Sequence, residues 1–238
     1  MKKLLLCMAF LLCMLCCAQA EKEQEIDWSR PVVALTFDDG PGEYTLDILQ
    51  LLEENGCRAT FFMLADKLGL FPEVVQAMAQ SENEIGTHTW AHENLTEVRE
   101  ATVMRSLSQS KERIEGETGR RVRFFRPPYG AVNGTVYQYC KNLELVIIIW
   151  SLDSNDWQAK TPDEITHTIL SQVQNGDIIL CHDIHANTAE AMKTVLPALV
   201  AQGYQLVTVS ELFSNYSEEL HYNAKYSRLN LEKVNIHK

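Results

Sequence analysis

The run TFDDGP, residues 36–41, directly follows the apolar stretch Val32–Leu35. An apolar run that ends in two acids and a Gly-Pro pair predicts a buried strand passing into a tight turn. Successive strand residues point to opposite faces, so Asp38 and Asp39 cannot present their carboxylates alike. Two carboxylates at the end of an apolar strand need a cation or hydrogen bonds to hold them. Taken alone, the stretch is explained equally well by a functional site and by a loop that caps the strand with Asp and turns at Gly-Pro.

The rest of the chain alternates β-rich runs with amphipathic helical patterns. The predicted strands are Val32–Phe37, Arg58–Leu64, Glu84–Thr87, Val122–Arg126, Leu145–Trp150, Asp177–Cys181 and Tyr204–Val209. The predicted helices are Tyr44–Asn55, Pro72–Ser81, Glu97–Thr118, Gly134–Asn142, Pro162–Gln174 and Thr188–Gln202. Such alternation predicts an α/β fold with a parallel sheet and helices outside it. Seven strands with polar groups after many of them favour a closed or nearly closed β/α barrel, with a doubly wound sheet as the alternative.

The first twenty residues have the layout of a secretory signal peptide. Lys2 and Lys3 precede an apolar run from Leu4 to Cys17, and residues 18–20 (Ala-Gln-Ala) offer a cleavage site. The run is short for a spanning helix, and an uncleaved membrane anchor is the alternative. We expect a signal peptide at 1–20, a lead-in at 21–31, one domain at 32–213 and a peripheral extension at 214–238. The protein would be exported to the cell envelope or the extracellular space.

Composition narrows the choice of partners. The formal net charge of −11 argues against nucleic acid and against electrostatic binding to membranes. No stable membrane insertion is expected after signal cleavage, and a monomer is favoured. Four of the seven cysteines lie in the first twenty residues, and an odd number, Cys57, Cys140 and Cys181, remains. We therefore predict no disulfide scaffold.

Polar clusters directly follow or close five of the predicted strands. They are Asp38-Asp39, His88-Thr89-Trp90-Ala91-His92, Arg126-Pro127-Pro128-Tyr129-Gly130, Asp153-Ser154-Asn155-Asp156-Trp157 and Leu180-Cys181-His182-Asp183. In a parallel α/β barrel these positions share one rim, at the carboxyl ends of the strands, where such folds keep their active sites. The occurrence of polar clusters at five strand ends favours one functional site over five unrelated turns.

Within this set, His88 and His92 are four residues apart, which on a helical turn places both imidazoles on one face. Alone, this spacing more often reflects two unrelated histidines. Two histidines and a carboxylate are a common ligand set for a divalent cation with open positions. One of Asp38 and Asp39 can then bind the cation while the other acts as general base.

In these five motifs the sequence resembles the polysaccharide deacetylases with a NodB-homology domain, carbohydrate esterase family 4. The motifs occur in order and span Val32 to about Phe213. The resemblance implies a distorted seven-stranded β/α barrel. It also implies metal-dependent removal of acetyl groups from N-acetylglucosamine units of a polysaccharide or oligosaccharide, such as peptidoglycan or chito-oligosaccharide. The implied cation is Zn²⁺, with Co²⁺, Ni²⁺ or Mn²⁺ accepted in some members.

The resemblance assigns the metal ligands and the base. Asp39, His88 and His92 match the metal triad, and Asp38 matches the general base that takes a proton from the attacking water. Arg126 matches the residue that holds Asp38 ionised and oriented, a task for which a guanidinium fork is suited.

The resemblance also assigns the groups around the scissile bond. The backbone N–H of Tyr129 matches the oxyanion donor, and His182 matches the general acid that protonates the departing amine. Asp156 matches the carboxylate that tunes His182. Leu180 and Trp157 match the walls of the pocket for the acetyl methyl group, although either could be ordinary core.

Some assignments stay open at this level. Asp153 could share or replace the role of Asp156, and Asp183 and His185 have no implied role. An O-acetylxylan esterase is the first alternative function, and a non-catalytic carbohydrate-binding protein is a weaker one. A structural zinc domain is disfavoured because such sites close all four positions with protein ligands, often cysteine.

Overall fold

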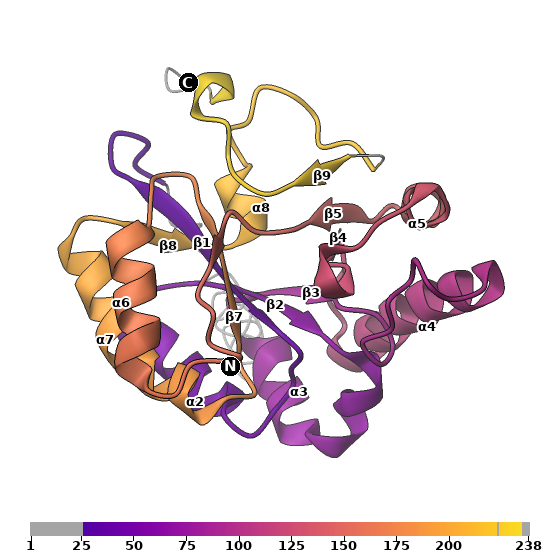
Figure 1. Ribbon diagram of the computed structural model, residues 1–238, viewed down its shortest axis with the longest axis horizontal. Helices are drawn as coiled ribbons and strands as arrows, with labels where there is room; N and C mark the ends of the chain where they lie inside the picture. Colours follow the sequence, from indigo (N-terminus) through magenta and orange to yellow (C-terminus); the bar gives the residue numbers. More distant parts are fainter. Residues whose placement is uncertain (1–25, 223, 235–238) are drawn as a thin grey trace, which may run out of the picture.

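The computed structural model describes residues 26–222 and 224–234, which form a curved parallel sheet flanked by helices (Figure 1). The segment expected to be a signal peptide lies outside these residues. The strands are β1 (Val32–Asp38), β2 (Thr60–Met63), β3 (Glu84–Thr87), β4 (Phe124–Phe125), β5 (Val146–Ile148), β6 (Leu152–Asp153), β7 (Ile178–His182), β8 (Gln205–Val207) and β9 (Lys225–Tyr226). All pairings between these strands are parallel, so the predicted α/β class is confirmed.

The order of the strands distinguishes this curled sheet from a doubly wound one. Strands β1 to β5 lie side by side in chain order, and β7 pairs with the other edge of β1. A doubly wound sheet would reverse its strand order near the middle, and this sheet does not. After β5 the chain runs through residues 149–151 into β6, which pairs with β7 at Leu152 and Ile179. The chain itself therefore links the two sides of the curled sheet, which forms a half-barrel in the described residues.

The number of strands differs from the predicted seven. Each predicted strand is present, but the sheet in the described residues has nine strands because β6 and β9 are added. Each of these two is only two residues long. A strand of two residues is too short to show an alternating pattern, so it cannot be predicted from its sequence.

Six helices in the described part of the chain match the predicted ones, all but α5 (Gly134–Asn142) with shifted ends, and the short α8 (Val209–Leu212) is not among the predicted helices. The helices are α2 (Thr45–Glu54), α3 (Pro72–Gln80), α4 (Glu100–Thr118), α5, α6 (Pro162–Gln172), α7 (Ala186–Ala201) and α8, with 3₁₀ turns η1 (Ala65–Leu70), η2 (Pro128–Gly130) and η3 (Leu231–Lys233). Thr161 caps α6 by accepting from the backbone N–H of Glu164. Gly119 ends α4 in the left-handed conformation, at φ 68°.

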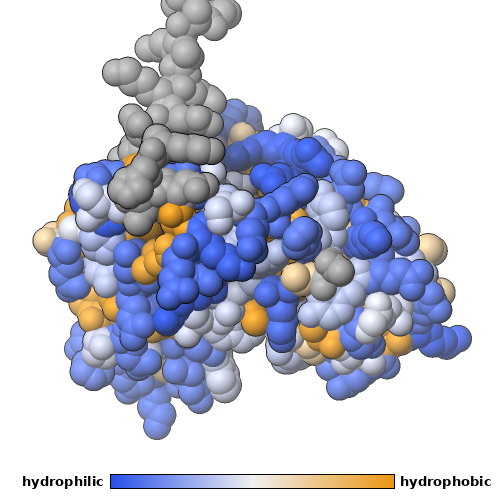
Figure 2. All heavy atoms as spheres, turned by 90° about the horizontal axis from the view of Figure 1, so that it is seen from above, coloured by the Kyte–Doolittle hydropathy of each residue, from blue (hydrophilic) through white to orange (hydrophobic). Residues whose placement is uncertain are grey.

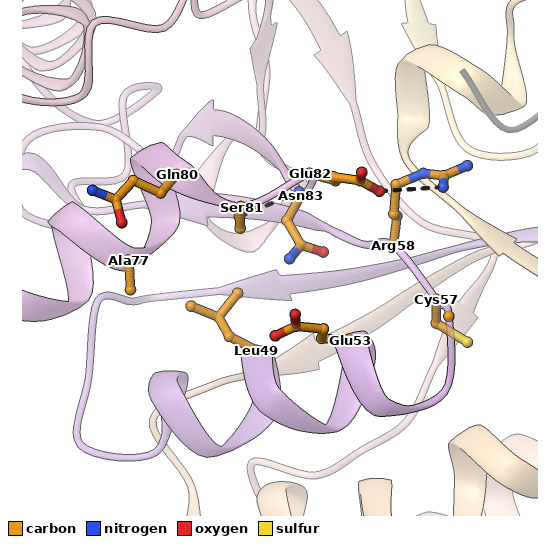
Figure 3. Close-up of a pocket in the computed structure, with 10 residues that line it drawn as sticks. Leu49, Glu53, Cys57, Arg58, Ala77, Gln80, Ser81, Glu82 and Asn83 are labelled. Atoms are coloured by element: carbon orange, nitrogen blue, oxygen red, sulfur yellow. Dashed lines mark hydrogen bonds and ion pairs between the residues drawn. The ribbon is translucent and has the colours of Figure 1, made fainter. Parts of the chain in front are cut away.

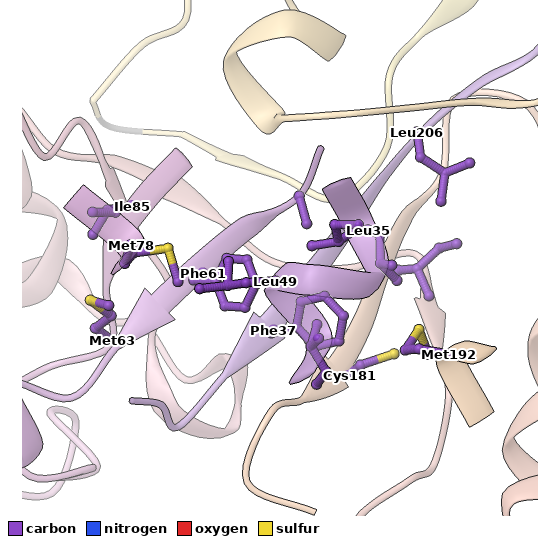
Figure 4. Close-up of a cluster of buried hydrophobic side chains, with 14 of the residues drawn as sticks. Leu35, Phe37, Leu49, Phe61, Met63, Met78, Ile85, Cys181, Met192 and Leu206 are labelled. Atoms are coloured by element: carbon purple, nitrogen blue, oxygen red, sulfur yellow. The ribbon is translucent and has the colours of Figure 1, made fainter. Parts of the chain in front are cut away.

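Strand β1 is buried along its whole length because both of its faces pack. Its odd-numbered residues from Val33 to Phe37 belong to the large hydrophobic cluster shared with the helices, where Phe37 stacks on Phe61 (Figure 4). Its first even-numbered residues belong to a second cluster on the opposite face. By the same alternation, the side chain of Asp38 is directed to the inner face of the sheet.

The segment after Phe213, expected to be peripheral, packs against the sheet beside β5 (Figure 1). Strand β9 pairs with β5, and the backbone N–H of Ile149 donates to the carbonyl oxygen of Tyr226 at 2.8 Å. Leu229 is 2% exposed and belongs to the second cluster. Its N–H donates to the carbonyl oxygen of Gly176 at 2.8 Å, which ties the segment to the start of β7. The segment therefore covers the amino-terminal end of the barrel.

The surface is largely polar. Figure 2 shows a face on which hydrophilic side chains predominate and hydrophobic ones form small groups. Among the described residues, no helix combines the length and the apolar character that a membrane crossing requires. The three cysteines Cys57, Cys140 and Cys181 are buried and free.

Candidate active site

Asp38, the last residue of β1, and Arg126, which directly follows β4, form a buried ion pair at the carboxyl ends of the strands. We call this end of the sheet the mouth of the barrel. Nη1 of Arg126 donates to Oδ1 of Asp38 at 2.8 Å and to Oγ1 of Thr36 at 2.7 Å. Nη2 donates to the carbonyl oxygen of Ile149 at 3.1 Å, and the guanidinium lies 4.2 Å from the centre of the Phe62 ring. Burial raises the pKa of Asp38, and the positive charge of Arg126 opposes that rise. The guanidinium thus fixes the orientation of the carboxylate.

Asp39, His88 and His92 bring three ligand atoms together. Nε2 of each imidazole lies 3.6 Å from Oδ1 of Asp39. Among the described residues, this is the one group of three such side chains whose ligand atoms all lie within 4.8 Å of one another. Oδ1 of Asp39 is buried and has no hydrogen-bond partner. Because an unpartnered buried oxygen is costly, the donor set fits a divalent cation with positions left open.

The hydrogen bonding of His88 presents its free nitrogen to this site. Nδ1 of His88 lies 2.6 Å from the backbone oxygen of Arg126. A carbonyl oxygen only accepts, so Nδ1 carries the hydrogen and Nε2 keeps its lone pair. Burial lowers the pKa of His88 to about 3 despite the nearby charge of Asp39. The imidazole is therefore neutral at physiological pH, which is the form that binds metals.

Four non-glycine residues near the site have a left-handed backbone. They are Asp39 (φ 73°), Thr89 (φ 77°), His92 (φ 61°) and Tyr129 (φ 60°). This conformation costs about 1–2 kcal/mol for an ordinary residue and persists only where the surroundings enforce it. The loops after β1 and β3 and the turn η2 after β4 are therefore held in unfavourable geometries where the candidate residues gather.

His182 ends β7 and is aligned with Asp38 across the β1–β7 pairing. Nδ1 of His182 lies 2.7 Å from Oδ1 of Asp156. Oδ2 of Asp156 accepts from the backbone N–H of His182 at 2.6 Å and from Oγ1 of Thr188 at 2.7 Å. The imidazole is thus fixed by a buried carboxylate, and its other nitrogen, Nε2, is left for chemistry.

The electrostatics of this pair favour the imidazolium form. Burial alone would lower the pKa of His182, but the hydrogen bond and charge of Asp156 outweigh it and raise the pKa to about 9. Asp153, the open alternative, instead accepts from the backbone N–H of Asn155 at 2.8 Å. Asp156 is therefore the carboxylate that hydrogen-bonds to His182.

Asp183, for which the sequence predicts no role, packs against the loop that carries the two acids. A Cβ added to Gly40 would lie 2.2 Å from Oδ2 of Asp183. The same oxygen accepts from Oγ1 of Thr45, which itself accepts from the backbone N–H of Gly42 at 2.9 Å. Burial raises the pKa of Asp183 to about 7. The only signals in the sequence are an acid right after the motif histidine and the glycine of TFDDGP.

The remaining candidates, Tyr129, Trp157 and Leu180, differ in exposure and contacts. Tyr129 is 69% exposed, and its ring lies edge-on to His92 with centroids 4.9 Å apart. Trp157 is 58% exposed. Leu180 is buried on β7, as a core residue would be, and pairs with Asp153 of β6. Tyr129 thus contacts His92, one of the three ligand residues.

A cavity of about 570 Å³ lies away from these residues, between α2 and the end of α3 (Figure 3). Its lining includes Leu49, Cys57 and Asn83. The chain segments before β2 and β3 border it, so it lies at the opposite end of these strands from Asp39 and His88. None of the candidate residues lines it. The donor chemistry, and not the cavity volume, therefore identifies the site.

Comparison with known proteins gives a consistent assignment. The family described as polysaccharide deacetylase matches residues 26–148. The peptidoglycan-N-acetylmuramic acid deacetylase PdaC of Bacillus subtilis is 35% identical over 192 residues, which cover 80% of this chain and 40% of that protein. The peptidoglycan-N-acetylglucosamine deacetylase PgdA of Listeria monocytogenes is 35% identical over 195 residues, which cover 82% and 41%. The chain thus spans about two fifths of the length of these relatives.

The fold gives the same result. A solved structure titled "T48 deacetylase with substrate" superposes with a TM-score of 0.79 and 32% identity, covering 85% of this chain and all of that one. The region matched by the family contains the ligand residues, Asp38 and Arg126. By sequence and by fold, this chain belongs to the polysaccharide deacetylases with a NodB-homology domain, carbohydrate esterase family 4.

Proposed function

We propose that the protein is a metal-dependent hydrolase that removes the acetyl group from N-acetylglucosamine units of peptidoglycan or chito-oligosaccharide. The observation that carries the proposal is the unpartnered, buried Oδ1 of Asp39 between two imidazoles, with a second carboxylate held separately beside it. Oδ2 of that second carboxylate, Asp38, lies 3.8 Å from Nε2 of His88. Two neighbouring acids in different settings suit two different tasks.

Asp39, His88 and His92 would hold the cation, most simply Zn²⁺, because nitrogen and oxygen donors with an open position are typical of catalytic zinc. Bound there, the cation supplies a Lewis acid that polarises the acetamide carbonyl and acidifies water. Co²⁺, Ni²⁺ or Mn²⁺ could replace Zn²⁺ at the same donors.

Asp38 acts as the general base. Its Oδ1 is occupied by Arg126 at 2.8 Å, so Oδ2 is the oxygen that takes a proton from the attacking water. The water oxygen forms the new bond to the acetyl carbon. The backbone N–H of Tyr129 donates to the oxyanion that results, which stabilises the tetrahedral intermediate.

His182 acts as the general acid. As the carbon–nitrogen bond breaks, its imidazolium gives a proton to the leaving nitrogen, and the products are acetate and a free amine. The hydrogen bond from His182 to Asp156 keeps that proton available at neutral pH. Trp157 and Leu180 form the walls that receive the acetyl methyl group.

The partner is an N-acetylated polymer outside the cell, and the protein is exported to reach it, working as a monomer. PdaC of Bacillus subtilis and PgdA of Listeria monocytogenes are peptidoglycan deacetylases, which supports this substrate class. Access at the exposed rim, where Tyr129 and Trp157 lie, suits a polymeric substrate.

Acetate release from a panel of substrates tests the proposal. The panel is peptidoglycan, chitin oligomers and acetylxylan, each with the purified protein, with chelator, and with chelator followed by Zn²⁺. We expect release from peptidoglycan or chitin oligomers, loss with chelator and recovery with Zn²⁺. Release from acetylxylan alone would make the protein an O-acetyl esterase. Release that chelator leaves unchanged would refute the role of the three ligand residues.

A further inference from the structure

A short turn outside the five motifs contacts the loop that carries Asp39. We call residues 64–67, which close β2 and begin η1, the bridging turn. The backbone N–H of Leu64 donates to the carbonyl oxygen of Gly40 at 2.8 Å. Nζ of Lys67 donates to the backbone oxygen of Asp39 at 2.9 Å. The bridging turn thus holds two consecutive peptide groups of this loop.

The same turn also contacts the loop that carries the two histidines. The N–H of Ala65 donates to the carbonyl oxygen of Thr89 at 3.2 Å, and the N–H of Asp66 donates to that of Trp90 at 2.9 Å. Four consecutive residues therefore bridge the two loops from which all three metal-ligand side chains come. The spacing between Asp39 and the histidines is fixed through this turn.

The contacts fall on strained backbone. Two of the four acceptor carbonyls belong to Asp39 and Thr89, whose φ angles are 73° and 77°. A left-handed non-glycine residue relaxes unless its surroundings over-determine it. At Asp39 this constraint comes from Lys67, because its ammonium group fixes the peptide oxygen of Asp39. Oδ1 of the same residue faces both imidazoles.

We propose that Lys67 is a positioning residue that, with the bridging turn, holds the backbone of Asp39 in the left-handed conformation and so sets the affinity of the site for its cation. The inference rests on the metal role proposed above for Asp39. It adds a group that touches neither the cation nor the substrate and that acts through the ligand.

The sign of the effect separates this role from a purely electrostatic one. An ammonium group near a cation site repels the cation, so its removal would tighten binding if charge alone mattered. Positioning requires the reverse, because a relaxed Asp39 moves its carboxylate away from the histidines. Loss of groups that orient metal ligands typically weakens binding about 10- to 100-fold.

The variants are Lys67→Met, which keeps the aliphatic stem, Lys67→Leu as a second deletion of the ammonium, and Lys67→Arg, which keeps a cationic donor. Lys111→Met is the matched control, because Nζ of Lys111 also donates to a backbone oxygen, that of Val122, at 2.9 Å, but lies on α4. The measurements are the Zn²⁺ dissociation constant by competition with a coloured chelator, the visible spectrum of the Co²⁺-loaded protein, and the melting temperature of the metal-free protein.

We expect the Zn²⁺ dissociation constant to rise about tenfold or more in Lys67→Met and Lys67→Leu, with an altered Co²⁺ spectrum and partial rescue in Lys67→Arg. Lys111→Met should bind Zn²⁺ like the wild type even if its melting temperature falls. Folded Lys67 deletions that bind Zn²⁺ as tightly as the wild type, or more tightly, would overturn the inference. A wild-type protein that binds no Zn²⁺ would instead overturn the proposed function.

Discussion

Nη1 of Arg126 lies 2.8 Å from Oδ1 of Asp38, and the two side chains are 0% and 3% exposed. Removing two charges from water costs several kcal/mol per ion, and the pair tolerates this only because each charge has its partner. The sheet alternation directs Asp38 to the inner face. The guanidinium reaches it from Arg126, which directly follows β4, the second strand beyond its neighbour β2. The pair thus joins the stability of the barrel to the orientation of the proposed base.

Arg126→Met should destabilise the fold by about 3–5 kcal/mol, because it leaves the Asp38 carboxylate buried without a partner. Urea unfolding followed by circular dichroism measures the change. Arg121→Met is the control, since Arg121 pairs with Glu144 at 3.1 Å but both side chains are more than half exposed. That pair should contribute less than about 1 kcal/mol. Equal losses in the two variants would contradict the importance given to the buried pair.

Asp38→Asn should lower the rate of acetate release about 10²- to 10⁴-fold, which is the usual contribution of a general base. The amide is isosteric but cannot take the proton. Zn²⁺ binding, measured by the same competition method, should stay close to that of the wild type because Asp39 and both histidines are intact. Full activity in this variant would remove Asp38 from the proposed mechanism.

Asp156→Asn should move the alkaline limb of the rate–pH profile to lower pH. In the wild type, His182 donates only while protonated, so activity should fall as the pH rises through its pKa of about 9. Without the charge of Asp156, the effect of burial prevails and the pKa drops, so the fall begins at least about one pH unit earlier. The raised pKa also means that this pair stabilises the fold fully below pH 6.5, and that the contribution is lost as the pH rises towards 9. An unmoved alkaline limb would show that another group controls it.

Gly40→Ala should destabilise the protein by about 1–3 kcal/mol and weaken activity, because the new methyl group would lie 2.2 Å from the carboxylate of Asp183. Gly116→Ala is the control: Gly116 lies inside α4, and a Cβ there meets nothing within 4 Å. That change should stabilise the protein by about 0.5–1 kcal/mol, since glycine weakens a helix interior. In thermal unfolding, the melting temperature should fall for Gly40→Ala and rise for Gly116→Ala. Changes of the same sign would contradict the tight contact at Gly40.

Leu229→Ala should cost about 2–5 kcal/mol of unfolding free energy, because Leu229 is buried in the second cluster. Leu231→Ala, two residues further along the same segment, should cost much less, since Leu231 is 41% exposed. Denaturant unfolding of both variants compares them. Two equally small losses would mean that the segment after Phe213 contributes little to the core.

Much of this molecule can be predicted from its sequence because the long elements carry periodic signals. Strand β1 reads as a continuous apolar run since both of its faces are buried, and α6 begins at a recognisable cap at Thr161. The gathering of Asp39, His88 and His92 follows from a rule about parallel sheets, namely that strand ends share one rim. The structure brings these three residues together as that rule requires.

What could not be predicted depends on contacts between distant residues. Strands β6 and β9 exist because neighbouring strands offer free edges, and two residues show no pattern of their own. Whether Asp153 or Asp156 contacts His182 depends on the turn at Asn155, whose φ is 55°. The packing of Asp183 under Gly40 and the bond from Lys67 to Asp39 join residues far apart in the chain, and no local spacing reports them.

The segment that covers the amino-terminal end of the barrel has a consequence for the order of events in biosynthesis. Until Tyr226 and Leu229 have been made, apolar side chains such as Phe124 and Val146 on the inner face lack part of their cover. A growing chain therefore completes this core only after the segment up to Leu229 has left the ribosome.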